Sequence, residues 1–199
     1  MVLVRCLNRT VSLRYSVQLV LRDVMKLRSA TILDAKAIAE IHAKSWQSTY
    51  NNVLTKHYLS SVVPKERNDV WHKRLINPKP NQHVVVAEYD NELIGFACAF
   101  AAENATWGSY LDNLHVRQSF RRKGIGKALL LDVAHWCFDR EPNKGLCLLV
   151  NQDNINAQQF YNKFGARNAQ VDVWNAPDGS VVPTFWFVWD QLHGVVGIA

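Results

Sequence analysis

The chain has 199 residues, of which 48% are hydrophobic and 20% charged, and its formal net charge is +6. This length and balance are typical of one globular domain and exclude an intrinsically disordered chain. Half of the excess positive charge comes from residues 1–24, so the rest is only mildly basic and gives little support for nucleic-acid binding. No apolar run approaches the roughly 18 residues of a membrane span, and no membrane partner is expected.

Residues 1–24 are predicted to be a basic extension ahead of the domain. They contain four arginines and one acid, Asp23, but lack the apolar core and cleavage site of a signal peptide. A second methionine, Met25, opens a clearly patterned segment. We therefore expect a dispensable extension over 1–24, a domain over 25–192 and a C-terminal tail over 193–199.

Four cysteines, Cys6, Cys98, Cys137 and Cys147, form no C-x-x-C pair. Three of them lie inside apolar runs, which is typical of buried free thiols. Free thiols indicate a reducing compartment, so the expected location is cytoplasmic.

The first half of the domain predicts two helices and three strands. Apolar residues recur at helical spacing over 31–46, with Thr31 or Asp34 as the cap. Pro64 fits the first turn of a second helix, which ends before Pro78. The segment 83–100 contains two β-rich runs around Asp90 and its neighbour asparagine, a hairpin signal, and a third strand is expected over 107–116.

The second half predicts helix, strand, helix and two strands. Residues 124–138 have a helical pattern, and the apolar run 145–150 is the kind of strand found inside a sheet. A helix over 154–164 stops at Gly165, and strands over 167–174 and 181–190 flank an Ala-Pro-Asp-Gly turn. The pattern predicts one mixed α/β domain without an internal repeat.

The segment RRKGIGKALL, residues 121–130, indicates a phosphate-binding loop. A Walker loop would need Gly where Arg121 stands, and the dinucleotide fingerprint would need Gly or Ala where Leu129 stands. What fits is Arg-x-x-Gly-x-Gly, formed by Arg121, Gly124 and Gly126 between a strand and a helix. Glycines let the backbone approach a ligand closely, and the start of the helix offers unpaired N–H groups to a pyrophosphate. The alternative is a helix that simply begins after a glycine turn.

A second motif follows: Asn154-x-x-Ala-x-x-Phe160-Tyr161-x-x-Phe164-Gly165. In this order the two motifs resemble the GCN5-related N-acetyltransferase (GNAT) family. The opening segment from Leu27 to Tyr50 also resembles the family's first strand and helix, and the resemblance covers about residues 26–190. It implies an α/β GNAT fold, a mixed and mostly antiparallel sheet with helices on both faces and a splay between the fourth and fifth strands. It also implies that acetyl-CoA is the co-substrate and that its pantetheine arm enters this splay.

The resemblance implies that the end of the fourth strand offers backbone groups to pantetheine and that the glycine loop wraps the pyrophosphate. Asn154 is expected near pantetheine, or as a helix cap, or as both. Tyr161 is the expected general acid for the departing thiolate, with a core aromatic as the alternative. The implied cofactor-binding residues are Leu114, His115, Val116, Arg121, Arg122, Lys123, Gly124, Ile125, Gly126, Lys127, Asn154 and Tyr161.

The general base departs from the family pattern. Some relatives carry a glutamate on the fifth strand, where this chain has Leu149. In other relatives the base lies on the fourth strand, where this chain has Asp112, and strand parity puts Asp112 on one face with Leu114. Asp112 is the expected catalytic residue, acting through water, and the alternative is that it only anchors a positively charged substrate. Glu103 is a rival, and a carboxylate that bonds a neighbouring turn is the alternative. His115 alternates to the opposite face, where its ring is expected to pack.

The resemblance places the acceptor site among the first two helices, their connecting loop and the final hairpin. Aromatic residues there suit an ammonium or an apolar group, and the expected substrate residues are Trp46, Tyr50 and Trp174. Tyr58, Trp71 and Trp186 are further aromatic residues of these regions, and core filling is the alternative for each.

The expected function is transfer of an acetyl group from acetyl-CoA to a primary amine, either a small molecule or a protein N-terminus. The alternatives are an acyl-CoA sensor without catalysis, transfer of another acyl group and transfer to oxygen. No metal and no nucleic acid are expected, and the protein is expected to be a monomer or a homodimer.

Overall fold

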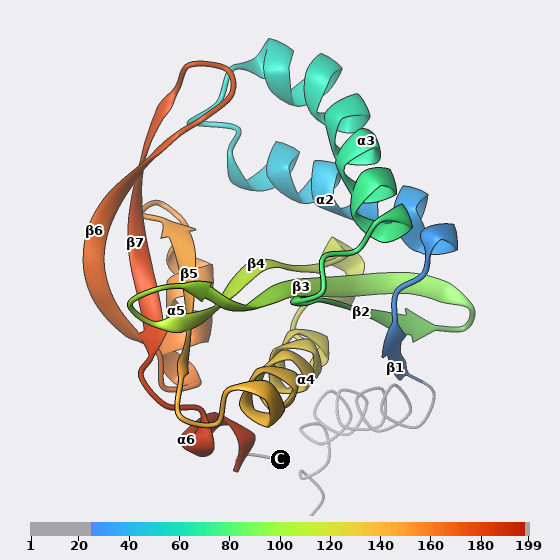
Figure 1. The fold of residues 1–199 in the computed structure, drawn as a ribbon. Helices are drawn as coiled ribbons and strands as arrows, with labels where there is room; N and C mark the ends of the chain where they lie inside the picture. The colour runs from blue at the N-terminus through green and yellow to red at the C-terminus, as the bar shows by residue number, and fades with distance from the viewer. Residues whose placement is uncertain (1–24, 198–199) are drawn as a thin grey trace, which may run out of the picture.

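A seven-stranded sheet runs through residues 25–197, the part of the chain that this computed structural model describes. The predicted extension over 1–24 and residues 198–199 lie outside the described residues. The strands are β1 (Lys26–Ser29), β2 (Gln82–Tyr89), β3 (Glu92–Asn104), β4 (Gly108–Val116), β5 (Gly145–Asn151), β6 (Arg167–Asn175) and β7 (Val181–Trp189). They lie in the order β1-β2-β3-β4-β5-β7-β6 (Figure 1). Among the strands of residues 25–197, only the β4–β5 pair is parallel.

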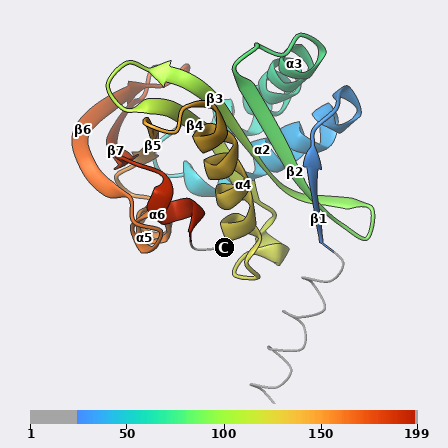
Figure 2. The ribbon, with the colours of Figure 1, turned by 60° about the horizontal axis from the view of Figure 1, so that its bottom comes forward.

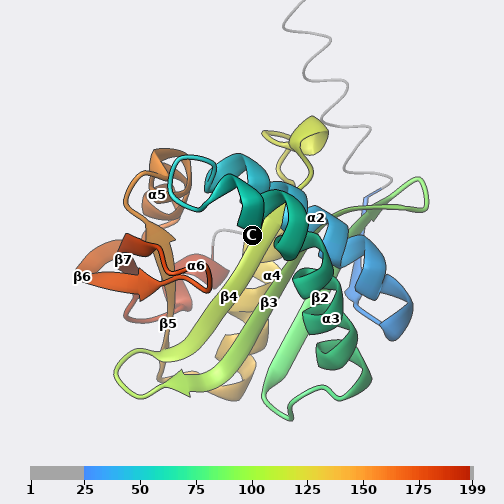
Figure 3. The same cartoon turned by 90° about the horizontal axis from the view of Figure 1, so that it is seen from above.

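Helices cover both faces of this sheet. The helices α2 (Ala35–Thr49) and α3 (Val63–Ile76) lie over one face, as Figure 3 shows from above. The helices α4 (Ile125–Arg140) and α5 (Ile155–Lys163) and the short α6 (His193–Val196) lie on the other (Figure 2). Single turns of helix, η1 (Ile32–Asp34), η2 (Tyr58–Val62) and η3 (Gln118–Phe120), complete the described elements. The predicted fold class is confirmed.

The predicted helices and strands are present, and local chemistry accounts for their ends. Asp90 and Asn91 have φ angles of 51° and 58°, which is the backbone of a tight hairpin turn. The Asp34 carboxylate accepts from the Thr31 N–H at 2.7 Å and from the Thr31 hydroxyl at 3.1 Å, which closes the start of η1 directly before α2. Arg28 on β1 donates two 2.8 Å hydrogen bonds to the same carboxylate.

Three features were not predicted. The π-helical turn η2 precedes α3, and β3 runs on to Asn104. In the segment expected as a C-terminal tail, residues 193–196 form α6, and Val195 is buried against the main core. Its neighbours there include Leu192, so this segment buries apolar surface although no pattern in its few residues indicates a helix.

The apolar residues of the sheet divide between its two faces. Toward α4 and α5 the core contains Leu129, Val133, Leu146 and Phe187. Toward α2 and α3 it contains Ile38, Val86, Phe96 and Trp71, the last without any exposed surface. Three cysteines, Cys98, Cys137 and Cys147, are buried free thiols as predicted.

The strands β4 and β5 separate soon after they meet. They pair only through Gly108↔Gly145, Ser109↔Leu146 and Tyr110↔Cys147, whereas β4 stays paired with β3, and β5 with β7, well beyond these positions. Backbone N–H and C=O groups of residues 111–116 and 148–151 therefore lack partners across this junction. The predicted splay between the fourth and fifth strands is confirmed.

Candidate functional site

The glycine loop joins the end of β4 to the start of α4. Arg122 and Gly124 have φ angles of 62° and 89°, so the backbone turns sharply through the left-handed region before α4 begins. A Cβ atom at Gly124 would meet nothing within 4 Å, which leaves this side of the loop open. The first N–H groups of α4 have no partner within the helix, and they point toward the loop. This is the geometry that holds an anionic group.

The charged side chains of the loop lie around this helix start. Arg121 donates from Nε to the Val116 carbonyl at 3.3 Å, and the Lys123 ammonium lies 4.8 Å from the Phe120 ring centroid. Arg121 and Arg122 are exposed. Positive charge therefore surrounds the open backbone, as expected for a phosphate ligand.

The first turn of α4 also lies beside β4 and α5. A Cβ atom at Gly126 would be 3.5 Å from the Phe160 ring and 3.9 Å from Leu114 Cδ2. The two sequence motifs are therefore neighbours in space, with the end of β4 between them. Any side chain larger than hydrogen at Gly126 would reduce the room among these three elements.

Asn154 and Tyr161 belong to α5. The Asn154 side chain accepts from the Ala157 N–H at 3.2 Å, so its capping role is present. Tyr161 is buried, with its ring 5.2 Å from that of Phe160 and 5.9 Å from that of Trp189. Burial, followed by the nearby Tyr50 hydroxyl, raises the pKa of Tyr161 above its usual value. The phenol therefore keeps its proton at neutral pH.

The predicted common face for Asp112 and Leu114 is wrong. Register along β3 steps from Cys98↔Asn113 to Ala99↔Leu111, so Asp112 is the extra residue of a β-bulge. Leu114 packs in the core toward α4, whereas the Asp112 carboxylate accepts a 2.5 Å hydrogen bond from Arg74 on α3. The bulge reverses the alternation on which the prediction depended. Glu103 lies elsewhere, at the end of β3, where it pairs with Lys79 and Asn81.

His115 packs on the α2 face, as predicted from its alternation with Leu114. Its Nδ1 lies 2.9 Å from the Ser45 hydroxyl, and its ring centroid lies 4.7 Å from that of His42. His42 accepts from the Trp71 indole N–H through Nδ1 at 3.0 Å, so its own proton is on Nε2, which is buried without a partner. Burial holds the pKa of His42 well below its usual value and lowers that of His115 to about 4.

The three predicted substrate residues form one aromatic cluster. The Trp46 ring centroid lies 5.4 Å from that of Tyr50 and 5.5 Å from that of Trp174, and the last two are 5.8 Å apart. The cluster joins the end of α2 to the β6–β7 hairpin on the face that carries Asp112 and His115. Each of its rings is only partly buried.

The other aromatic residues have different surroundings. Trp71 is core, and Tyr58 is buried with its hydroxyl donating to Glu66 at 2.5 Å. Trp186 contacts Tyr110 and donates from its indole to Asp172 at 2.7 Å. For Trp71 the alternative of core filling is therefore correct.

Arg67 is a neighbour of this cluster that sequence reasoning missed. Its guanidinium lies 4.6 Å from the Trp46 ring centroid. A signal was present, because Arg67 precedes Trp71 by four residues and so shares its helix face. Because arginine on a surface helix is usually solvated, a contact between Arg67 and the aromatic cluster was not predicted.

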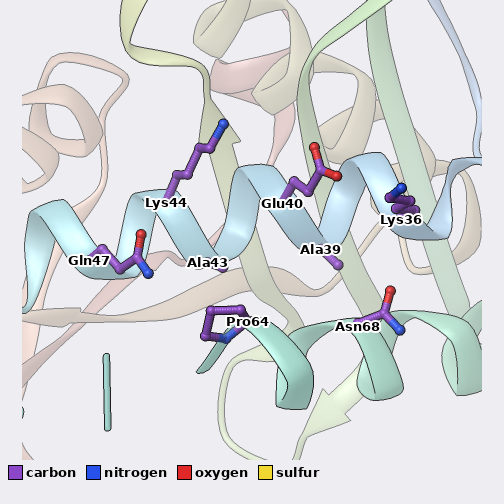
Figure 4. Close-up of a pocket in the computed structure, with 8 residues that line it drawn as sticks. All are labelled: Lys36, Ala39, Glu40, Ala43, Lys44, Gln47, Pro64 and Asn68. Atoms are coloured by element: carbon purple, nitrogen blue, oxygen red, sulfur yellow. The ribbon is translucent and has the colours of Figure 1, made fainter. Parts of the chain in front are cut away.

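Two grooves adjoin α2. One, of about 490 Å³, lies between α2 and the end of β4, and its lining includes Ser45, Val116 and Arg121. The other, of about 400 Å³, lies between α2 and α3, where Ala39 and Ala43 are opposite Pro64 and Asn68 (Figure 4). The first borders two of the predicted cofactor-binding residues, and the second borders none.

Within residues 25–197, no three His, Cys, Asp or Glu side chains gather in a group that could hold a metal ion. Over the same residues, every helix is too short or too polar to cross a bilayer.

Comparison with known proteins agrees with this geometry. A sequence profile of the acetyltransferase (GNAT) family matches residues 37–166. The uncharacterized N-acetyltransferase YuaI of Bacillus subtilis is 30% identical over 110 residues, an alignment that spans 54% of this chain and 61% of YuaI, less than two thirds of its length. The spermidine N(1)-acetyltransferase of Thermoplasma acidophilum is 24% identical over 151 residues, 74% of this chain and 91% of that protein.

Solved structures share the fold. The PaiA N-acetyltransferase of Thermoplasma acidophilum in complex with coenzyme A superposes with a TM-score of 0.61 at 21% identity, covering 80% of this chain and 97% of that one. YncA of Salmonella typhimurium with acetyl-CoA gives 0.62 at 17% identity, covering 84% and 94%. The profile match extends over more than half of the chain, and the chain therefore belongs to the acetyltransferase (GNAT) family.

Proposed function

We propose that this protein transfers an acetyl group from acetyl-CoA to a primary amine by direct attack within a ternary complex. The observation that carries the proposal is the separation of β4 and β5 after Tyr110 and Cys147, next to an open glycine loop. An extended thioester arm fits between strand edges that offer unpaired backbone groups, and its pyrophosphate fits the helix start.

The residues present fit such a donor. A Cβ atom at Gly124 would meet nothing within 4 Å, so the loop backbone is open there, and Arg121, Arg122 and Lys123 supply positive charge. Backbone groups of Leu114, His115 and Val116 extend along the unpaired edge of β4. We assign the donor to these groups.

The chemistry follows from the same geometry. The amine forms a bond to the acetyl carbon, negative charge builds on the carbonyl oxygen, and a fixed N–H of β4 stabilises that charge. The C–S bond then breaks, and Tyr161 gives its proton to the departing thiolate. Because burial raises its pKa, the phenol is protonated at neutral pH but is a weaker acid than an exposed tyrosine, so proton transfer requires the thiolate sulfur to lie against the hydroxyl. Holding both reactants in one site supplies much of the remaining acceleration.

The Asp112 carboxylate is less suited to act as the general base, because Arg74 already donates a hydrogen bond to it. In this scheme the amine reaches the thioester uncharged, the proton that nitrogen loses after attack passes to solvent, and the Tyr161 phenolate takes a proton back from solvent before the next turnover.

Two measurements on the purified chain test the proposal. Calorimetry with CoA should show micromolar or tighter binding, and a thiol-release assay with acetyl-CoA should respond to added primary amines. Binding of CoA without amine-dependent thiol release would favour a sensor and overturn the enzyme assignment. Absence of CoA binding would overturn the donor site as well.

A further inference from the structure

We infer that the acceptor is a small amine that carries a carboxylate, such as an amino acid, and that Arg67 binds this carboxylate. The inference rests on the proposed function, because it names the acceptor class for that reaction. Three observations support it: where Arg67 lies, that its Nε has no hydrogen-bond acceptor, and that nearby carboxylates are already paired with other groups.

Arg67 is a largely buried cation, and one of its N–H donors has no acceptor. Its side chain is only 12% exposed. Nη2 donates to Glu66 at 2.5 Å, while Nε is buried without a partner. A buried donor without an acceptor is destabilising, so a ligand atom that accepts from Nε would be favoured here. A guanidinium presents its donors as a planar fork that matches a carboxylate.

The position of Arg67 is on the acceptor side of the proposed reaction. It lies over Trp46, which belongs to the aromatic cluster with Tyr50 and Trp174. The Trp46 ring centroid lies 5.3 Å from that of His42, which in turn lies 4.7 Å from that of His115 on β4. Arg67, the aromatic cluster and the end of β4, where the amine would attack, are therefore linked by ring contacts on one face of the sheet.

The carboxylates around this region are already engaged. Glu66 accepts from Arg67 and Tyr58, and Asp112 accepts from Arg74. Asp178 accepts from the backbone N–H groups of Thr55 and Ser180. Glu66 and Asp112 are each paired with an arginine, so their negative charge is already balanced and does not serve the several ammonium groups of a polyamine. An amino acid instead brings a carboxylate that can accept from Nε of Arg67, which Glu66 leaves without a partner, and the aromatic rings can contact its side chain.

The first test compares acceptors in the wild-type protein by acetyl-CoA-dependent thiol release. The panel pairs amino acids having aromatic, aliphatic and basic side chains with their carboxamides and decarboxylated amines, and adds spermidine. We expect kcat/KM for the best amino acid to exceed that of its carboxamide at least 10-fold. The carboxamide has the more readily deprotonated amine, so intrinsic reactivity works against this result and a preference for the acid must come from binding.

The second test removes the guanidinium. In Arg67→Gln we expect kcat/KM for the preferred amino acid to fall about 10- to 100-fold, mainly through KM, as for loss of a charged hydrogen bond. Its carboxamide should change less than 3-fold. Arg67→Lys keeps the positive charge but lacks the planar pair of donors, so its kcat/KM for the preferred amino acid should lie between those of wild type and Arg67→Gln. Arg140→Gln is the matched control, because Arg140 lies 4.1 Å from the Trp136 ring centroid on α4, away from this face.

The possible outcomes distinguish failure of the carboxylate inference from failure of the proposed acetyl transfer. Equal use of acids, carboxamides and spermidine, or an equal loss on all acceptors in Arg67→Gln, overturns the carboxylate inference and leaves acetyl transfer intact. Failure of every amine to release thiol overturns the proposed function and the inference with it. Should Arg67→Gln melt far below wild type, the wild-type comparison of acid and carboxamide decides alone.

Discussion

The two faces of the sheet build their halves of the proposed site from different parts of the chain. On the α4 and α5 face the site is mostly backbone: the loop at Gly124, the first turn of α4 at Gly126 and the unpaired edge of β4. On the α2 and α3 face it is made of side chains. Three aromatic rings lie there beside Arg67, and the paired imidazoles of His42 and His115 lie close by.

This difference has a physical origin. Acetyl-CoA always presents the same phosphates and thioester, which backbone N–H groups bind whatever the neighbouring side chains are. An acceptor must be distinguished from other amines, and that requires side chains with particular charges and shapes. CoA binding should therefore tolerate changes of the loop's exposed side chains better than changes of its glycines, while the side chains of the α2 and α3 face should determine acceptor specificity.

The largest effect is expected on the backbone face, from Gly126→Leu. A leucine side chain there would extend from a Cβ already 3.5 Å from Phe160 into the space beside Leu114. We expect CoA affinity to fall about 1000-fold, or about 4 kcal/mol, as measured by calorimetry.

The control is Gly194→Ala on α6, where a Cβ atom meets nothing within 4 Å. It should leave CoA binding unchanged. If Gly126→Leu bound CoA as tightly as wild type while remaining folded, the donor would not pass between α4, β4 and α5.

The next effect concerns the chemical step, through Tyr161→Phe. Removing the phenol proton while keeping the buried ring should lower kcat about 100-fold, because general acid catalysis contributes this much or more. CoA affinity should stay within about 2-fold of wild type, since the ring packing remains. Steady-state kinetics with calorimetry on the same preparation would measure both.

Tyr89→Phe provides the matched comparison, since Tyr89 is at the end of β2 and its ring faces Phe120. Unchanged kcat in Tyr161→Phe would remove the proton donor from the mechanism.

The sequence predicts the backbone part of the site better than the part built from side chains. The turn at Gly124 is predictable because glycine directly before an apolar helical pattern favours a left-handed residue at the helix start, and its φ of 89° agrees. The predicted common face of Asp112 and Leu114 is wrong because strand alternation assumes an unbroken ladder, and the bulge on β4 inserts one residue. Arg67 was missed because nothing local distinguishes a buried arginine from a solvated one. The splay itself was predicted only through family resemblance, since no local pattern in β4 or β5 ends their pairing.

The side-chain face should also make stability depend on pH. His42 and His115 are neutral in the folded protein, and the pKa of His115 is lowered from 6.5 to about 4 by burial and then by Arg121 and Arg67. The unfolded chain binds their protons near pH 6.5, so the stability from these groups is present above that pH and is lost as pH falls toward 4. Each group should steepen the loss by about 1.4 kcal/mol per pH unit.

Urea unfolding at several pH values in this window would measure the slope. His115→Asn should reduce it by about 1.4 kcal/mol per pH unit. His72→Gln, at an exposed position of α3, should leave it unchanged. A slope equal in wild type and His115→Asn would mean that His115 is charged in the folded protein.

The smallest effect is expected from Asp112→Asn, and it decides between two roles for one carboxylate. The residue is partly exposed and paired with Arg74, so the pair should contribute only about 1 kcal/mol to the free energy of unfolding. If Asp112 only holds Arg74, kcat should remain within about 3-fold and the pH–rate profile should keep its shape, because no titrating catalytic group is lost. Arg74→Gln should then give a similar loss of stability, since each variant breaks the same ion pair. A fall in kcat of about 100-fold in Asp112→Asn, with the acidic limb of the profile removed, would instead identify Asp112 as the base and place proton removal on the same face as Arg67.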